Sequence, residues 1–221
     1  ERLYEGVVGA SGGKGRMALD NGEKPLDEVR VGGAISHAID RETFIREVLD
    51  GRGKAIGSHF SPTDAGYVHL AGMYPYDPAR ARVLLKEAGV TLPLKMTLTL
   101  PPTPYARAGG PVVAADLAKV GIELQLEQVE WPQWLAGAFK GQFDMTLINH
   151  VEPLDYQIFA DPAYNFGYVS PAFRTLVERH AASVNARGRH FLFVDIQRYM
   201  ATGAAHDWVF APQLITVRRQ G

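Results

Sequence analysis

The chain has 221 residues, of which 46% are hydrophobic and 21% are charged; this is enough apolar material for one folded domain and argues against disorder. Its formal net charge of −1 excludes a strongly basic surface, so nucleic acid is not an expected partner. The absence of cysteine excludes a disulfide framework, a thiolate zinc site and a cysteine nucleophile.

The N-terminal part of the chain is predicted to hold two strands followed by two helices. The strands are expected over 4–8 and 17–21, joined by a flexible glycine-rich turn at 9–15. Asp27 and Asp40 are the predicted N-caps of the helices. Gly32 and Gly33 each cost the first helix about 1 kcal/mol relative to alanine, so this helix is expected to depend on tertiary packing. The apolar faces of the two helices are Val31, Ile35, Ala38 and Ile39, and Phe44, Ile45, Val48 and Leu49.

Strands and helices alternate through the rest of the chain, which favours an α/β domain. After a long loop over 51–75, Asp77 is expected to cap the clearest helix and Gly89 to end it in a left-handed conformation. The strands predicted downstream are 95–100, 122–127, 143–148 and 208–217. Four helices are predicted downstream. The first carries Val113, Leu117 and Val120 on one face, the second starts at Pro132, and the last two span 171–180 and 187–202.

Three short motifs suggest enzyme or nucleotide chemistry, and each has a simpler interpretation. Residues 9–13 match the nucleophile elbow around Ser11, but that elbow needs a helix directly after the serine, so we interpret the segment as a glycine turn. Lys14 lacks the serine or threonine that follows the lysine of a phosphate loop. His150 and Glu152 match the H-x-E of zinc deaminases, which also need two cysteines that this chain lacks.

Polar residues follow two of the predicted strands, where ligands of open α/β sheets usually bind. Tyr105 and Arg107 follow the strand over 95–100 and precede a helix start; Arg107 is either a carboxylate ligand or a solvated surface arginine. Glu152 and Asp155 follow the strand over 143–148. These two acids are candidates for binding an ammonium group, for acid–base catalysis, or for capping the next helix.

Aromatic residues lie near these acids in the sequence. Aromatic walls with a few polar anchors are typical of small-ligand clefts, and an aromatic core is the alternative for each residue. The residues are Trp131, Trp134, Tyr156 and Phe159.

The order of several segments closely resembles the peptide/nickel-type (family 5) solute-binding proteins of ABC importers. Residues 29–31 and 34–41 resemble the signature helix of that family, and residues 76–81 with 84–89 resemble its second hallmark. Weaker matches follow in the same order at 121–124, 143–145 and 210–212.

The resemblance implies a periplasmic-binding-protein type II-like lobe, with a mixed sheet flanked by helices. The family's fold has two lobes that close on a ligand, and the match covers the C-terminal lobe alone. We therefore expect residues 1–221 to form a single C-terminal ligand-binding lobe, with hinge strands near 1–21 and 207–217 and the N-terminal lobe absent. The implied location is periplasmic or extracytoplasmic, although the first residues do not form a signal peptide and no apolar run reaches the about 18 residues of a membrane span.

The resemblance also implies partners and roles. The partners are a peptide or similar solute, the N-terminal lobe, and an ABC permease; self-association through an exposed half-cleft is a further expectation. No enzyme activity, cofactor or metal is expected. Relatives grip a peptide carboxylate with an arginine at the place of Arg107, and the ligand's amino group with an acid at the place of Glu152 or Asp155. His150 stands where relatives usually have tryptophan.

The full set of candidate ligand-binding residues is therefore Tyr105, Arg107, Trp131, Trp134, His150, Glu152 and Asp155. Two alternatives remain open at this point. One is a hydrolase that uses Ser11 or the pair of Glu152 and Asp155. The other is a nickel-type metal-chelate carrier that uses His150.

Overall fold

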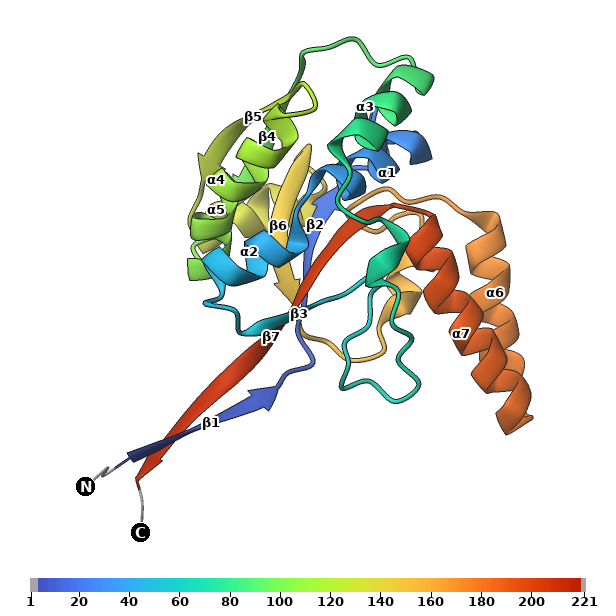
Figure 1. Ribbon diagram of the computed structural model, residues 1–221. Helices are drawn as coiled ribbons and strands as arrows, with labels where there is room; N and C mark the ends of the chain where they lie inside the picture. Colours follow the sequence, from blue (N-terminus) through green and yellow to red (C-terminus); the bar gives the residue numbers. More distant parts are fainter. Residues whose placement is uncertain (1–3, 220–221) are drawn as a thin grey trace.

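A computed structural model describes the backbone of residues 4–219 and the side chains of residues 8–219 (Figure 1). Its described part contains a mixed sheet in which the strand order is β1-β7-β2-β6-β4-β5, with β3 paired to β7. This arrangement confirms the predicted α/β class. The strands are β1 (Tyr4–Ala10), β2 (Lys14–Leu19), β3 (Gly53–Ala55), β4 (Leu94–Leu100), β5 (Ile122–Gln128), β6 (Met145–His150) and β7 (His206–Arg219).

Parallel pairing brings the carboxyl ends of three strands to one edge of the sheet. β4 runs parallel to both β5 and β6, with Leu98 opposite Leu126 on one side and Met145 on the other. β2 is antiparallel to β6, so its first residue, Lys14, pairs with His150 at the same edge. Loops after β4, β5 and β6 therefore meet the start of β2, which is where a ligand of such a sheet is expected.

The terminal strands form a two-stranded ribbon that leaves the body of the protein, as Figure 1 shows. β7 pairs with β2 through residues 206–210 and then with β1 through residues 213–219. The expected strands near both chain ends are thus present, although residues 1–3 of the predicted hinge lie outside the described residues. β2 starts three residues before the predicted Met17, which leaves only residues 11–13 as the turn.

Helices cover the sheet and follow the predicted capping pattern closely. The side chain of Asp40 accepts a hydrogen bond from the Thr43 amide at 3.0 Å, and that of Asp77 accepts one from Arg80 at 2.9 Å. The helices are α1 (Val29–Ala38), α2 (Arg41–Val48), α3 (Pro78–Glu87), α4 (Pro104–Ala118), α5 (Trp131–Ala136), α6 (Pro171–Ala182) and α7 (Ala186–Thr202), with short 3-10 turns η1 (Ala71–Met73), η2 (Ala138–Lys140) and η3 (Tyr156–Ala160).

Two local predictions need adjustment. The N-cap of α1 is Glu28 rather than Asp27, and its carboxylate accepts from the Arg30 amide at 3.2 Å. The long loop over 51–75 contains the short strand β3, which the sequence does not reveal because three residues are too few for an alternating pattern. Gly89 ends α3 with a φ of +72°, as predicted.

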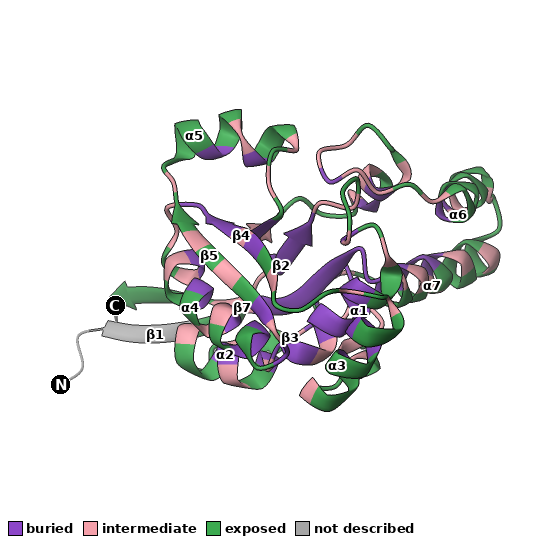
Figure 2. Cartoon of the chain, turned by 90° about the horizontal axis from the view of Figure 1, so that it is seen from above, coloured by how far each residue is buried: buried purple, intermediate pink, exposed green. Residues whose placement is uncertain are grey.

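The interior is divided into two apolar clusters. Figure 2 shows that β2 and α1 are almost entirely buried, whereas α6 and α7 expose their outer faces. The larger cluster lies between the sheet and α1 to α4, with Leu98 and Ile35 fully buried. The second is rich in aromatic side chains and lies under α6 and α7. Its aromatic members include Phe60, Tyr156, Phe159, Phe166, Phe173, Phe193 and Trp208.

Candidate ligand-binding site

A cavity of about 330 Å³ opens beside the carboxyl end of β6. Four of the predicted site residues line it, namely Trp134, His150, Glu152 and Asp155. Arg16 of β2 also lines it, together with aromatic side chains from α5, η2 and the loop before α6. These four residues were predicted from their closeness along the sequence, and in the structure they line one cavity.

A chain of hydrogen bonds joins four of the polar groups in and behind this cavity. Nε2 of His150 contacts Oδ2 of Asp155, and Nε2 of His59 lies 2.7 Å from the other oxygen, Oδ1. On its far side, Nδ1 of His59 lies 3.1 Å from Nη1 of Arg16. Asp155 therefore has both of its carboxylate oxygens engaged by histidines.

The arginine fixes the protonation of His59. A guanidinium group only donates hydrogen bonds, so Nδ1 of His59 must be the acceptor and Nε2 must carry the hydrogen that is donated to Asp155. This is the neutral imidazole. Burial, opposed by the hydrogen bond to Asp155 and assisted by Arg16, lowers the pKa of His59 to about 3. For Asp155 burial acts upward, but the bonds from His150 and His59 outweigh it and hold its pKa well below the usual range.

Lys14 holds the loop that carries the acids. Its side chain is fully buried, and Nζ donates a hydrogen bond to the backbone carbonyl of Glu152. Burial lowers the pKa of Lys14, although Asp155 and Asp64 oppose the change. Glu152 itself has 63% of its side chain exposed, and its Oε2 lies 3.2 Å from Nε2 of His150. Glu152 is therefore the freer of the two predicted carboxylates.

The predicted aromatic residues divide between the cavity and the core. Trp134 is buried and lines the cavity, and its indole N–H donates to Oγ1 of Thr146 at 3.0 Å. Trp131 is more exposed and meets Trp134 edge to face at 5.7 Å. Tyr156 and Phe159 belong to the aromatic core cluster, which is the alternative that the sequence left open for them.

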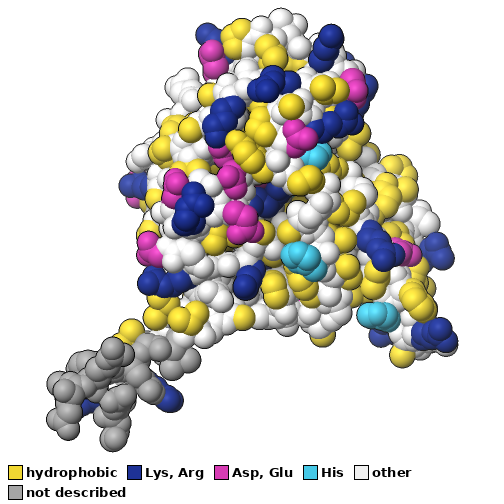
Figure 3. All heavy atoms as spheres, viewed as in Figure 1, with side chains coloured by type: hydrophobic (Ala, Val, Ile, Leu, Met, Phe, Trp, Pro, Cys, Tyr) yellow, Lys and Arg dark blue, Asp and Glu magenta, His cyan; other side chains and the backbone are white. Residues whose placement is uncertain are grey.

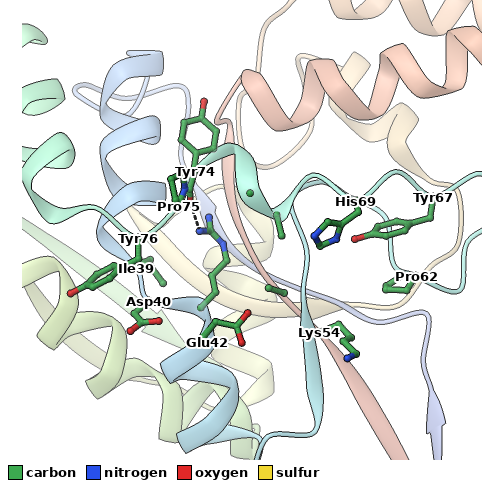
Figure 4. A pocket seen from close by; sticks show the side chains of 14 residues that line it. Ile39, Asp40, Glu42, Lys54, Pro62, Tyr67, His69, Tyr74, Pro75 and Tyr76 are labelled. Carbon is green, nitrogen blue, oxygen red and sulfur yellow. Dashed lines mark hydrogen bonds between the residues drawn. The ribbon is translucent and has the colours of Figure 1, made fainter.

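The described surface also has a larger cavity, of about 540 Å³, between the start of α2 and η1 (Figure 4). Asp40, Glu42, Lys54 and His69 line it, so its polar groups carry both signs of charge. Figure 3 shows acidic and basic side chains interspersed on this face of the molecule. None of the predicted site residues lines this cavity, whereas four of them line the cavity at β6, and the cavity at β6 is therefore the candidate ligand site.

Comparison with known proteins agrees with the fold. Residues 3–165 match the family described as bacterial extracellular solute-binding proteins, family 5 Middle. The chain belongs to this family. It is 32% identical over 139 residues to the dipeptide-binding protein of Escherichia coli K12, which covers 61% of this chain and 26% of that protein. It is 27% identical over 227 residues to di/tripeptide-binding protein 1 of Pseudomonas aeruginosa UCBPP-PA14, which covers 92% of this chain and 42% of that protein.

Solved structures show the same fold. The periplasmic binding protein DppA of Helicobacter pylori, in complex with the peptide STSA, matches with a TM-score of 0.88 at 23% identity over 99% of this chain and 45% of that one. NikA of Brucella suis, in complex with Fe(III)-EDTA, matches with a TM-score of 0.81 at 23% identity over 98% of this chain and 48% of that one. The chain thus spans less than half the length of these relatives. Over residues 4–219, no helix has the length and apolar character that crossing a membrane requires.

Within this family 5 chain, Arg107 and Tyr105 lie at the expected edge but inside a helix. α4 begins at Pro104, so both residues are in its first turn rather than before it. Nη2 of Arg107 contacts Oε1 of Glu130 at 2.7 Å, and Arg107 does not line the cavity at β6. The hydroxyl of Tyr105 accepts a hydrogen bond from the Asn149 amide at 2.9 Å, which ties α4 to the end of β6.

The two alternative chemistries find little support in the geometry. Ser11 lies between two strands, where its hydroxyl donates to the Pro212 carbonyl at 2.8 Å, so the strand–helix context of a nucleophile elbow is missing. His59, His150 and Asp155 place potential metal-ligand atoms within 4.8 Å of one another. A histidine that binds a metal normally donates its other N–H to an acceptor, yet His59 faces the donor-only Arg16 on that side, so this set fits a metal poorly.

Three residues of the site, Lys14, Arg16 and His59, were not predicted from the sequence. Lys14 falls in the turn predicted over 9–15, and Arg16 falls between that turn and the strand predicted from Met17, although two charges two residues apart beside the apolar run 17–19 are a signal for one polar face of a strand. His59 lies in the long loop over 51–75 and has no local signal. Its role comes from contacts with residues 43 and 96 positions away.

Buried neutral histidines predict that stability falls as the pH is lowered from about 6.5 towards 4. His59 and His206 are buried, and burial is the main reason that both pKa values lie below the ordinary 6.5. In this pH window the histidines are protonated in the unfolded chain but stay neutral in the folded chain. Each histidine therefore lowers the free energy of unfolding by up to about 1.4 kcal/mol for each unit by which the pH falls. Asp207 partly opposes this trend, because burial raises its pKa to about 6.

The variant His206→Leu isolates one of these contributions. His206 has no hydrogen-bond partner at either ring nitrogen, so leucine removes the titration without breaking a bond. Urea unfolding at pH 7, 6 and 5 should show a shallower loss of stability for His206→Leu than for the unchanged chain. Replacement of the exposed His190 by leucine should leave the pH dependence unchanged. An equal slope in all three proteins would contradict the prediction.

Proposed function

We propose that this chain is the C-terminal lobe of the substrate-binding component of an ABC-type importer, which binds a short peptide or similar solute and delivers it to a membrane permease. The observation that carries the proposal is the cavity at the carboxyl edge of the sheet, in a lobe from which the ribbon of β1 and β7 leaves (Figure 1). Two strands that leave a lobe side by side are suited to act as a hinge to a second lobe, and closure of two lobes buries a ligand between them. The location proposed for the protein is extracytoplasmic.

Charges and aromatic walls in the cavity support a ligand with an ammonium group. Glu152 is the better candidate for that group, because it is largely exposed, whereas the oxygens of Asp155 are engaged by histidines. Trp134 and His150 form walls of the same cavity. Arg107 does not line the cavity, and it would have to release Glu130 to act as the carboxylate ligand that the sequence suggests.

Exposed apolar side chains around the cavity support the proposal that a second lobe covers it in the complete protein. Large hydrophobic residues are exposed at 41–59% of their area in the loop after β6 and in α5 with η2. A surface of this kind is typical of an interface, which a second lobe of the same protein would supply; in its absence, self-association is the expected result. These residues are Val151, Leu154, Trp131, Leu135 and Phe139.

Calorimetry with a mixed dipeptide library tests this proposal. The gene product that carries both lobes should bind members of the library without hydrolysing them, and the 221-residue chain should bind weakly or undetectably because it offers half of the contacts. In the two-lobed protein, Glu152→Gln should weaken binding by about tenfold or more through loss of one charged contact. Glu178→Gln, at an exposed position of α6, is the matched control.

Two results would count against this function. One is tight dipeptide binding by the 221-residue chain alone, which would mean that the second lobe contributes little. The other is a two-lobed protein that binds no dipeptide, or that releases amino acids from the library on chromatography.

A further inference from the structure

Arg16 is a buried cation that no carboxylate neutralises directly. Its side chain is 4% exposed and comes from the central part of β2, between β6 and β7. Among residues 8–219, no carboxylate oxygen lies within ion-pair distance of its guanidinium. Burial lowers the pKa of Arg16, but only to about 10, so the group stays charged at neutral pH.

The hydrogen-bonding capacity of Arg16 is mostly unused. Of its three guanidinium nitrogens, Nη1 alone has a hydrogen-bond partner in the described part of the chain, namely the neutral ring of His59. Nε is buried without any partner. The rings of Phe159 and Phe166 lie 5.6 and 5.8 Å from Cζ and supply weak cation–π contacts. Burying a charge in such surroundings is costly unless a counter-ion is supplied.

The nearest acid does not fill this role. Asp155 reaches Arg16 only through His59, and its two oxygens already accept from His59 and His150. Glu152 lines the same cavity but points its carboxylate towards His150 and solvent. His59 thus lies between Asp155 and Arg16, and Arg16 lines the cavity with guanidinium donors that have no acceptor in the described part of the chain.

The walls of the cavity are mainly apolar, so they suit a ligand whose anionic group is attached to an apolar body. Trp134 and Thr146 use their polar atoms on each other and on the Thr99 carbonyl, which leaves apolar surface towards the cavity. Phe139, Phe143 and Phe166 line the cavity as well. A volume of about 330 Å³ holds a ligand of one or two amino-acid residues in size.

We infer that Arg16 forms a carboxylate subsite in this cavity, which takes an acidic group carried on an apolar or aromatic body. This inference rests on the proposed function in one respect: in a bound peptide, the carboxylate would lie at Arg16 and the ammonium group at Glu152. It assigns the carboxylate to a residue of β2, which lies on the opposite side of β6 from β4, the strand that precedes α4 and Arg107. The planar, multiply donating guanidinium suits two parallel hydrogen bonds to a carboxylate.

A pair of neutral and anionic probes tests the subsite on the 221-residue chain itself. N-acetyl-L-phenylalanine and N-acetyl-L-phenylalanine amide differ only in the carboxylate, and neither carries an ammonium group. Titration at millimolar concentrations, followed by the Nε–Hε resonance of Arg16 in ¹⁵N-labelled protein, should show binding of the acid at least about tenfold tighter than the amide. Arg16→Gln should abolish this preference, and the exposed control Arg46→Gln should retain it.

Equal affinities for acid and amide in the unchanged chain would overturn the inference, and that comparison needs no folded variant. A preference that persists in Arg16→Gln would overturn it too, while Arg16→Lys should keep part of the preference because it keeps the charge. The two proposals fail separately. A two-lobed protein that binds dipeptides and their C-terminal amides equally well would sink the subsite but leave the importer function. If the 221-residue chain prefers the acid to the amide but the two-lobed protein binds no peptide, the subsite stands and the importer function is rejected.

Discussion

Replacement of Arg41 by methionine is expected to destabilise the protein by about 3–5 kcal/mol, because it leaves a buried aspartate without its counter-charge. Nη2 of Arg41 bonds to Oδ1 of Asp207, whose side chain is fully buried and whose second oxygen has no partner. Methionine fills a similar volume but supplies no charge. The carboxylate must then either stay ionised in an apolar site or take up a proton.

Arg41 also joins segments that are distant in the sequence. Its Nε donates to the Trp208 carbonyl at 2.6 Å, and Nη1 donates to the carbonyls of Ser36 and Tyr74 at 3.1 and 2.9 Å. The end of α1, the turn η1 and strand β7 are held together through this one side chain. Figure 4 shows the bond to Tyr74 at the wall of the larger cavity. Loss of these bonds leaves backbone carbonyls unsatisfied and adds to the cost.

Titration of Asp207 distinguishes this mechanism from a simple packing defect. Burial raises the pKa of Asp207 to about 6 while Arg41 opposes the change, so removal of Arg41 raises the pKa further. A carboxyl group whose pKa is raised by folding takes up its proton at a higher pH in the folded state than in the unfolded state. The loss of stability of Arg41→Met, measured against the unchanged chain at the same pH, should therefore shrink as the pH falls from 8 to 5. The double variant Arg41→Met/Asp207→Leu should be more stable than Arg41→Met, since it removes the orphaned charge.

Urea unfolding monitored by circular dichroism at pH 8 and pH 5 measures both effects. Arg46→Met, at an exposed position of α2, is the matched control and should change stability by less than about 0.5 kcal/mol. A double variant that is less stable than Arg41→Met at both pH values would show that Asp207 contributes through contacts other than its pairing with Arg41.

Local signals in the sequence predicted the elements that depend on local chemistry. Asp40, Asp77 and Gly89 act through bonds and backbone angles within a few residues of themselves, and all three were placed correctly. β3 was missed because its three residues form a strand only through pairing with β7, about 160 positions away. The cap of α1 was misplaced by one residue, since Asp27 and Glu28 are both acceptors and the sequence does not rank them.

The candidate site divides along the same line. His150 is the last residue of β6 and Glu152 and Asp155 follow it, so a predicted strand end was enough to bring all three to one edge of the sheet. Arg16 and His59 join them only through tertiary contacts across 43 and 96 positions. The position of Arg107 at that edge was predictable from the strand before it, but its contact with Glu130 depends on the parallel pairing of β4 with β5.

Gly32→Ala is expected to destabilise the protein by about 2 kcal/mol or more, although alanine is the better helix former by about 1 kcal/mol. α1 passes so close to the segment after α7 that a Cβ at Gly32 would overlap the backbone oxygen of Ala204. A side chain can relieve such an overlap by changing its rotamer, but a backbone carbonyl can move only if the chain around it moves. Ala204 is itself buried, and its φ of +44° leaves that segment little room to move.

Gly33→Ala is the matched control, because it makes the same change at the next position of the same helix. The nearest atom to a Cβ at Gly33 is Cε1 of Tyr74 at 3.3 Å, which belongs to a side chain on a surface turn and can shift. Gly33→Ala should therefore be neutral or stabilising, as helix propensity alone predicts. Helix propensity contributes equally to both variants. The difference between their free energies of unfolding, measured in urea, therefore reports the steric contact with Ala204 alone. Equal stabilisation by both substitutions would mean that α1 and the Ala204 segment separate without cost, and that the glycine at position 32 is not required by packing.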